Sequence, residues 1–166
     1  MTDRKWLEGY SGQTAQQLAG LEGEYRTDSL VLAFEQAIGQ KAARQGDENI
    51  TTEERVVLVV EALEREVNNG GYSQFFQNSS PEFVSMVVDS LLRIGCPKTA
   101  QITQKAVDIL GLPNLSTASI ETAMATDNDE RDDQLNQCDD AYHTTAEDIA
   151  GRLFSFIKAK KTEIKL

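Results

Sequence analysis

The residues of this 166-residue chain with the clearest chemical potential are carboxylates, which gather between residues 121 and 148. This window holds ten acids and one base, so its formal charge is −9. The acids are Glu121, Asp127, Asp129, Glu130, Asp132, Asp133, Asp139, Asp140, Glu147 and Asp148, and the base is Arg131. The other 138 residues carry −2, because 15 bases nearly balance their 17 acids. Such local acidity favours a basic partner and disfavours direct binding to nucleic acid, since affinity for phosphates depends on Lys and Arg.

Helical phase divides these carboxylates into two groups. In a helix that turns Leu135, Cys138 and Tyr142 toward the core, four acids point outward, namely Asp129, Glu130, Asp133 and Asp140, and two lie nearer the boundary, namely Asp132 and Asp139. A continuous helix over residues 121–148 would extend ~42 Å. It would place one acid roughly every 4 Å, similar to the ~3.4 Å between phosphates of one DNA strand. Breaks expected near residues 128 and 143 would scatter the charges, and a merely solvated face that aids solubility stays an alternative.

A second polar cluster lies in residues 66–83, which read EVNNGGYSQFFQNSSPEF. Paired glycines allow a sharp turn, and aromatic and amide side chains surround them. The candidates are Asn69, Gly70, Gly71, Tyr72, Gln74, Phe75 and Asn78. One interpretation is a structural corner, in which the rings fill the core and the amides satisfy exposed backbone groups. The other is a pocket for a peptide or small ligand, in a toxin-neutralising type of module.

Metal binding and catalysis have little support. Asp139, His143 and Glu147 are spaced i, i+4 and i+8, but the threonines at 144 and 145 look like helix caps that end the alignment. The acids from residue 127 onward depart from a calcium loop, with Arg131 at the fifth position and Cys138 in place of the bidentate Glu. No nucleophile accompanies the single histidine. We therefore predict no metal site, no cofactor and no enzymatic activity.

The elements that must position these residues are helices. Nearly every readable segment has helical period, and a capping box of Thr51 and Glu54 opens the best-defined helix. Gly70 is expected to end this helix, and the next is expected to open at Ser80 with Pro81 in its first turn. We predict an all-α protein of about seven helices, with one domain over residues 1–166 and a loosely held segment at residues 1–12.

The run NNGGYSQFFQNSSPEF, residues 68–83, resembles the signature of a helical family of unknown function typified by the neisserial DNA-mimic protein. The similarity continues through residues 81–94, 95–106 and 135–157, and covers residues 50–160. This resemblance implies a helical fold. It also implies an acidic protein that occupies the DNA-binding surface of a transcription regulator with carboxylates arranged like phosphates. Because such acids are scattered over a surface, the resemblance assigns no role to a particular residue.

The remaining sequence features concern location and partners. No apolar run approaches the ~20 residues of a membrane span, and the first ten residues lack a secretory signal. The two cysteines, Cys96 and Cys138, are widely spaced, which is typical of reduced thiols in the cytoplasm. We predict a cytoplasmic, non-enzymatic protein that binds a basic partner, a DNA-binding regulator being the leading candidate. Binding to nucleic acid or membrane is not expected, and homodimer formation stays open.

Overall fold

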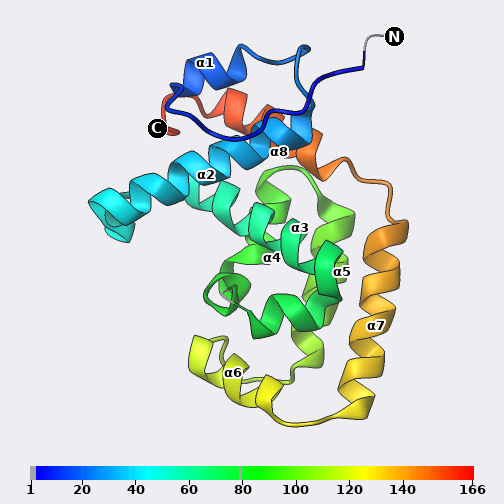
Figure 1. Ribbon diagram of the computed structural model, residues 1–166. Helices are drawn as coiled ribbons and strands as arrows, with labels where there is room; N and C mark the ends of the chain where they lie inside the picture. Colours follow the sequence, from blue (N-terminus) through cyan, green and yellow to red (C-terminus); the bar gives the residue numbers. More distant parts are fainter. Residues whose placement is uncertain (1–2, 79) are drawn as a thin grey trace. The chain divides into compact units, whose positions relative to one another are not determined.

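The computed structural model describes residues 3–78 and 80–166, which form eight α-helices (Figure 1). The helices are α1 Ala15–Ala19, α2 Thr27–Gln45, α3 Thr52–Gln77, α4 Val84–Arg93, α5 Pro97–Ile109, α6 Thr117–Ala125, α7 Asp129–Thr144 and α8 Ile149–Ala159. Short 3-10 turns lie at Asp47–Asn49 and Pro81–Phe83. The described residues contain no β-strand, so the predicted all-α class is confirmed. Within them, no helix is both long and apolar enough to cross a membrane.

The chain divides into two compact units. The first comprises the residues up to Glu61 together with Asp148–Leu166, and the second is Ala62–Glu147. The second unit holds fourteen acids and five bases, a formal charge of −9, whereas the first holds thirteen acids and eleven bases, a charge of −2. The acidity therefore belongs almost entirely to the second unit. A single domain over the whole chain stays a prediction.

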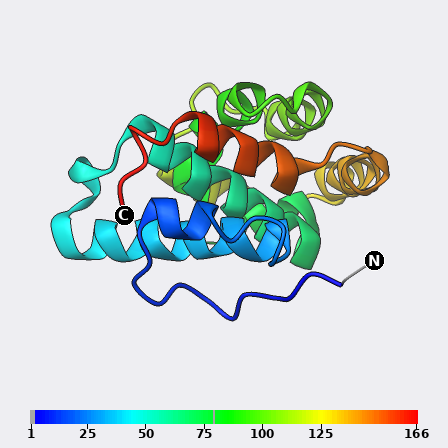
Figure 2. The same ribbon diagram turned by 90° about the horizontal axis from the view of Figure 1, so that it is seen from above.

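The first unit is built on the packing of α8 and α1 against α2 (Figure 2). Phe34 of α2 and Phe154 of α8 meet edge to face, with ring centroids 6.5 Å apart. The segment of residues 3–12 is bound to α2 through the N–H of Leu7, which donates to the Ser29 hydroxyl. Residues 1 and 2 of the predicted loose segment lie outside the described residues, and its looseness stays a prediction.

A buried ion pair holds the start of α3 in the first unit. The Lys41 ammonium donates to both oxygens of the Glu54 carboxylate at 2.8 and 2.9 Å, and Glu54 is fully buried. The same carboxylate accepts the N–H of Thr51, whose hydroxyl accepts the N–H of Glu54. The predicted capping box is confirmed. Its acidic member also neutralises a buried cation, so loss of either charge would cost about 3–5 kcal/mol.

The second unit contains the end of α3 and helices α4 to α7, with α5 in contact with both α4 and α7 (Figure 1). Fully buried side chains fill its core, among them Leu63, Phe76, Leu91, Ile120 and Leu135. The helix expected to open at Ser80 instead begins with a 3-10 turn, and its α-helical part starts only at Val84. The Ser80 side chain makes no capping hydrogen bond to this turn.

Candidate acidic interface

Helix α7 carries most of the acidic window. It begins after Asn128, whose side-chain oxygen accepts the N–H of Arg131 at 2.9 Å. Acids in its first turn suit the positive end of the helix dipole. The helix ends at Thr144, so the break expected near His143 falls at residue 145. Because α6 ends at residue 125 and α8 begins at 149, the continuous 121–148 helix does not form, and its regular ladder of acids is absent.

The inner side of α7 follows the predicted helical phase. Leu135, Cys138 and Tyr142 are buried, and burial raises the pKa of the Cys138 thiol, partly offset by Lys105. The fourth buried residue on this side is Arg131, only 8% exposed. A lone arginine within a run of acids reads as an exposed residue, so the sequence offered no signal for its burial.

The Arg131 guanidinium is fully engaged inside the second unit. Its Nη1 donates to the carbonyl oxygens of Ala123 and Thr126 at 2.8 and 3.0 Å. Its Nε donates to Asp132 at 2.8 Å, and its Nη2 lies 2.7 Å from the same carboxylate. These contacts satisfy carbonyls at the C-terminus of α6, where a cation is favourable. The only base of the acidic window is therefore turned away from the outer side of α7.

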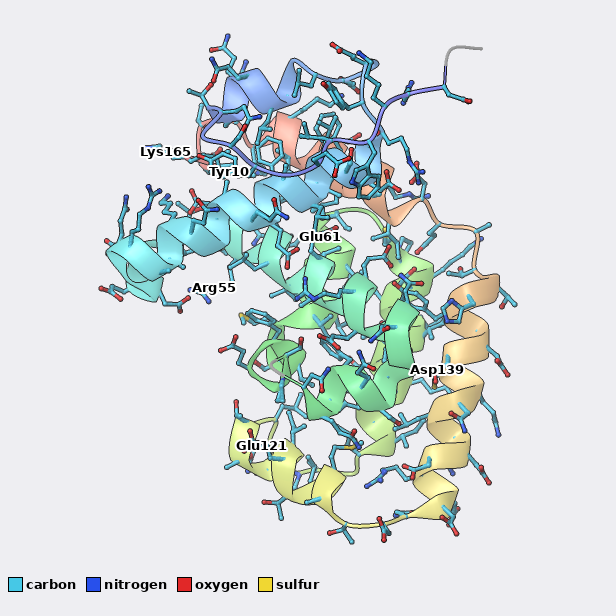
Figure 3. The ribbon with its side chains drawn as sticks, in the orientation of Figure 1. Tyr10, Arg55, Glu61, Glu121, Asp139 and Lys165 are labelled. Carbon is cyan, nitrogen blue, oxygen red and sulfur yellow. The ribbon has the colours of Figure 1, made fainter. Side chains whose placement is uncertain are left out.

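Four acids form what we call the outer face of α7, defined as Asp129, Glu130, Asp133 and Asp140. All four are exposed, and their carboxylates form no hydrogen bond or ion pair with the described residues. At about 100° per residue, residues 129, 133 and 140 fall within a sector of roughly 40°, and they rise ~16 Å along the helix. Figure 3 shows side chains projecting from α7 on the side away from α5. The outer face is thus a short stripe of uncompensated carboxylates.

The remaining acids near α7 position the fold. Asp139 accepts the N–H of Tyr72 at 2.7 Å (Figure 3). Burial raises the pKa of Asp139, while the hydrogen bond from Tyr72 acts in the opposite direction. Glu147 accepts the N–H groups of Lys98 and Thr99, both at 2.8 Å, at the start of α5. Of the two acids predicted at the boundary, Asp132 pairs with the buried arginine, and Asp139 fastens α7 to α3.

Two further acids share the properties of the outer face but were not among the predicted site residues. Glu121 on α6 (Figure 3) and Asp127 in the α6–α7 link are exposed, and neither carboxylate has a partner among the described residues. The helical-phase argument covered only one helix, so it could not relate them to α7. Their presence extends the exposed acidity of the second unit beyond α7.

The paired glycines bend α3 sharply at the predicted corner. Gly70 has φ −156° and ψ 21°, and Gly71 has φ 76° and ψ −175°, so two helical arms meet with no loop between them. The backbone of Gly71 is reached by few residues other than glycine. A Cβ at Gly71 would also collide with the Asp139 carboxylate. The turn and its contact with α7 therefore require glycine at this position.

The side chains of the corner are occupied within the fold. Tyr72 and Phe75 are completely buried, and the Tyr72 hydroxyl lies 2.7 Å from that of Thr103. Gln74 and Asn78 both donate their amide N–H groups to one oxygen of the buried Glu66, at 2.7 and 2.8 Å.

Asn69, Gly70 and Asn78 are the exposed members of the predicted corner, although the Asn78 amide still donates to Glu66. The structural interpretation accounts for the aromatic and amide side chains. Glu66, the acceptor that organises both amides, was not among the predicted residues.

The residues considered for a metal site are directed to different places. The Asp139 carboxylate contacts α3, and Glu147 lies beyond the end of α7 and contacts α5. His143 packs its ring against Tyr142 in the last turn of α7. Within residues 3–78 and 80–166, no three His, Cys, Asp or Glu side chains are placed to hold a metal ion.

Fold and surface together define an all-α protein that presents an uncompensated acidic helix face. The family model described as DMP19-like protein matches residues 48–160, which is well over half of the chain. The chain belongs to the DMP19-like protein family, as the resemblance of residues 68–83 predicted. No curated protein matches the chain. The matched range includes both the corner of α3 and the outer face of α7.

Proposed function

We propose that the protein binds a basic, nucleic-acid-binding protein through the outer face of α7 and thereby blocks the partner's nucleic-acid site. The observation that carries this proposal is the inward orientation of Arg131. Its guanidinium is held by Asp132 and by two backbone carbonyls. A mobile, exposed arginine at this position would neutralise part of the stripe, whereas the observed one leaves the exposed acids to a partner.

The spacing of the carboxylates along the stripe also suits the partner's basic surface, which would otherwise bind the phosphates of a nucleic acid. Asp129 and Asp133 are four residues apart, a rise of ~6 Å, which is about twice the ~3.4 Å rise between phosphates of one DNA strand. A patch of this kind raises the rate of association with a basic surface and loses strength as salt screens it.

Membership of the DMP19-like protein family supports the same function. The resemblance of residues 68–83 to this family implied an acidic protein that mimics DNA. The proposed activity is non-enzymatic, and we expect it in the cytoplasm. Whether two chains join to extend the acidic surface stays an open prediction.

The test compares two variants that lose the same formal charge. The face variant carries Asp129→Asn, Glu130→Gln, Asp133→Asn and Asp140→Asn. The control variant carries Asp3→Asn, Glu8→Gln, Glu82→Gln and Asp89→Asn, four changes at exposed acids elsewhere. Each protein is immobilised, and basic proteins are captured at low salt from an extract of the source cells.

The proposal predicts one basic partner, retained by the parent protein and the control variant but lost from the face variant. Duplex DNA added to the captured complex should release that partner, because both ligands would use one site. Equal recovery by all three proteins, or a partner that duplex DNA does not release, would contradict the proposal. The outer face would then be a solubility feature.

A further inference from the structure

A groove lies beside the start of α7 within the second unit. It is formed by the end of α5, the length of α6 and the residues that lead into α7, and it has a volume of about 570 Å³. This volume falls in the range of ~300–1,000 Å³ that is typical of ligand sites. We call it the α6 groove and define it by six of its lining residues, namely Leu110, Leu112, Ala118, Thr122, Ala123 and Thr126.

The surface of the α6 groove is apolar in part and carries no available cation. Leu110, Leu112, Ala118 and Ala123 contribute its apolar lining, and hydroxyls of Thr122 and Thr126 contribute polar groups. The one base that reaches it is Arg131, whose guanidinium is engaged by Asp132 and by carbonyls of the α6 terminus. An anionic ligand would therefore find no free positive charge in this groove.

The residues around the α6 groove are strongly acidic. Between residues 108 and 133 the chain holds seven acids and one base, a formal charge of −6. Along the chain, Glu121 precedes the lining residue Thr122, Asp127 stands between the lining residues Thr126 and Asn128, and Asp129 follows Asn128 on the outer face of α7. All three of these acids are exposed. A partly apolar groove within so acidic a stretch of the chain complements an apolar side chain flanked by Lys or Arg.

We propose that the α6 groove receives an apolar side chain from a Lys- or Arg-rich segment of the partner protein. This inference rests on the proposed function and adds the chemistry of the partner segment. The outer face would supply charge attraction and rapid association, and the groove would hold one anchoring side chain. Anchors in desolvated pockets carry much of the binding energy at protein interfaces, while charges at the rim contribute mainly to association rate.

The probe is a fluorescein-labelled helical peptide of Lys and Ala with one central Leu, compared with the same peptide carrying Ser at that position. Binding to the full chain is followed by fluorescence anisotropy at low and high salt. The groove is filled by Ala118→Trp, at an exposed groove position. The matched control is Ala125→Trp, which is exposed on the same helix but outside the groove.

The inference predicts that the Leu peptide binds roughly tenfold more tightly than the Ser peptide, from burial of one aliphatic side chain. Ala118→Trp should remove this difference, and Ala125→Trp should preserve it. Both peptides should weaken in high salt and with the face variant. A third peptide, with Gln in place of every Lys, should bind weakly.

Each other outcome overturns a defined part of the account. Equal binding of Leu and Ser peptides, with salt dependence intact, overturns the groove but leaves the outer face as the partner surface. Tight binding of the Gln peptide overturns the basic occupant, because the groove would then take neutral apolar ligands. Binding that responds neither to salt nor to the face variant contradicts the proposed function itself.

Discussion

Two polar regions of the second unit, the outer face of α7 and the corner of α3, differ in how their polar groups are satisfied. At the corner, the amides of Gln74 and Asn78 reach the buried Glu66, and the Tyr72 hydroxyl reaches Thr103. On the outer face, four carboxylates have no partner among the described residues. Polar composition alone does not distinguish a structural cluster from a binding surface. The hydrogen-bond partners of the polar groups distinguish the two, because buried polar groups must be satisfied within the fold.

Asp139 shows where the two regions meet. It belongs to the acidic run of α7, yet its carboxylate accepts the N–H of Tyr72 beside the glycine turn. Its neighbour Asp140 is exposed and has no partner within residues 3–78 and 80–166. Adjacent acids on one helix thus have different roles, since successive residues of a helix point about 100° apart. Substitutions at the corner should change stability, and substitutions on the outer face should change binding.

The largest effect is expected at the glycine turn. Gly71→Ala should lower the free energy of unfolding by about 2–4 kcal/mol, because its φ of 76° strains an alanine and the added Cβ meets Asp139. The matched control is Gly39→Ala in α2, where a Cβ meets nothing within 4 Å. That change should raise stability by roughly 0.5–1 kcal/mol. Unfolding in urea measures the free energy of unfolding of both variants. Equal stability of the two variants would contradict the structural role of the turn.

A smaller loss is expected at the amides of the corner. The double change Gln74→Ala and Asn78→Ala should cost about 1–3 kcal/mol, because it leaves the buried Glu66 carboxylate without two donors. Gln77→Ala, at an exposed position of the same arm, should stay within about 0.5 kcal/mol of the parent. Thermal unfolding followed by circular dichroism compares the stability of the double variant with that of Gln77→Ala. If the double variant kept full stability but lost a ligand, the corner would be a pocket after all.

A third prediction concerns Glu64, a carboxylate on the arm of α3 that leads into the corner. Burial raises its pKa from 4.5 to about 7. The folded state therefore binds more protons than the unfolded state between these values, and stability falls as the pH rises from about 4.5 through 7. Glu64→Gln should raise the free energy of unfolding by about 1–2 kcal/mol at pH 8 and leave it nearly unchanged at pH 4. A gain of equal size at both pH values would show that burial of charge is not the cause.

The smallest effect on stability is expected on the outer face. The free energy of unfolding of the face variant should stay within about 0.5 kcal/mol of the parent's, because the four carboxylates are exposed and pair with no group in the described part of the chain. Removal of the repulsion between these like charges should slightly stabilise the face variant. The control variant gives the reference for an equal loss of charge. A large loss of stability in the face variant alone would mean that these acids serve the fold.

Much of this arrangement was predictable, because it depends on local periodicity. The capping box of Thr51 and Glu54 and the exposure of the four outer acids of α7 follow from spacing along one helix. Gly70 and Gly71 also mark the turn, although α3 resumes directly after them.

What the sequence did not indicate are contacts between helices. The burial of Arg131 depends on where α6 ends, and the contact of Asp139 with Tyr72 joins residues 67 positions apart. Glu66 lies in the same run of residues as its two amide donors, but their convergence depends on the bend of α3. The start of α4 was misplaced because a 3-10 turn satisfies the same Ser-Pro signal.

The measurement that tests the central claim most directly is the affinity of the captured basic partner across a series of salt concentrations. It is made for the parent protein, the face variant and the control variant. The account predicts that affinity for the parent falls steeply with salt, and that the control variant follows the parent. The face variant should bind weakly and show a shallower salt dependence, because fewer charges are screened on binding. Matching affinities and slopes for the face and control variants would show that net charge alone, and not the outer face of α7, attracts the partner.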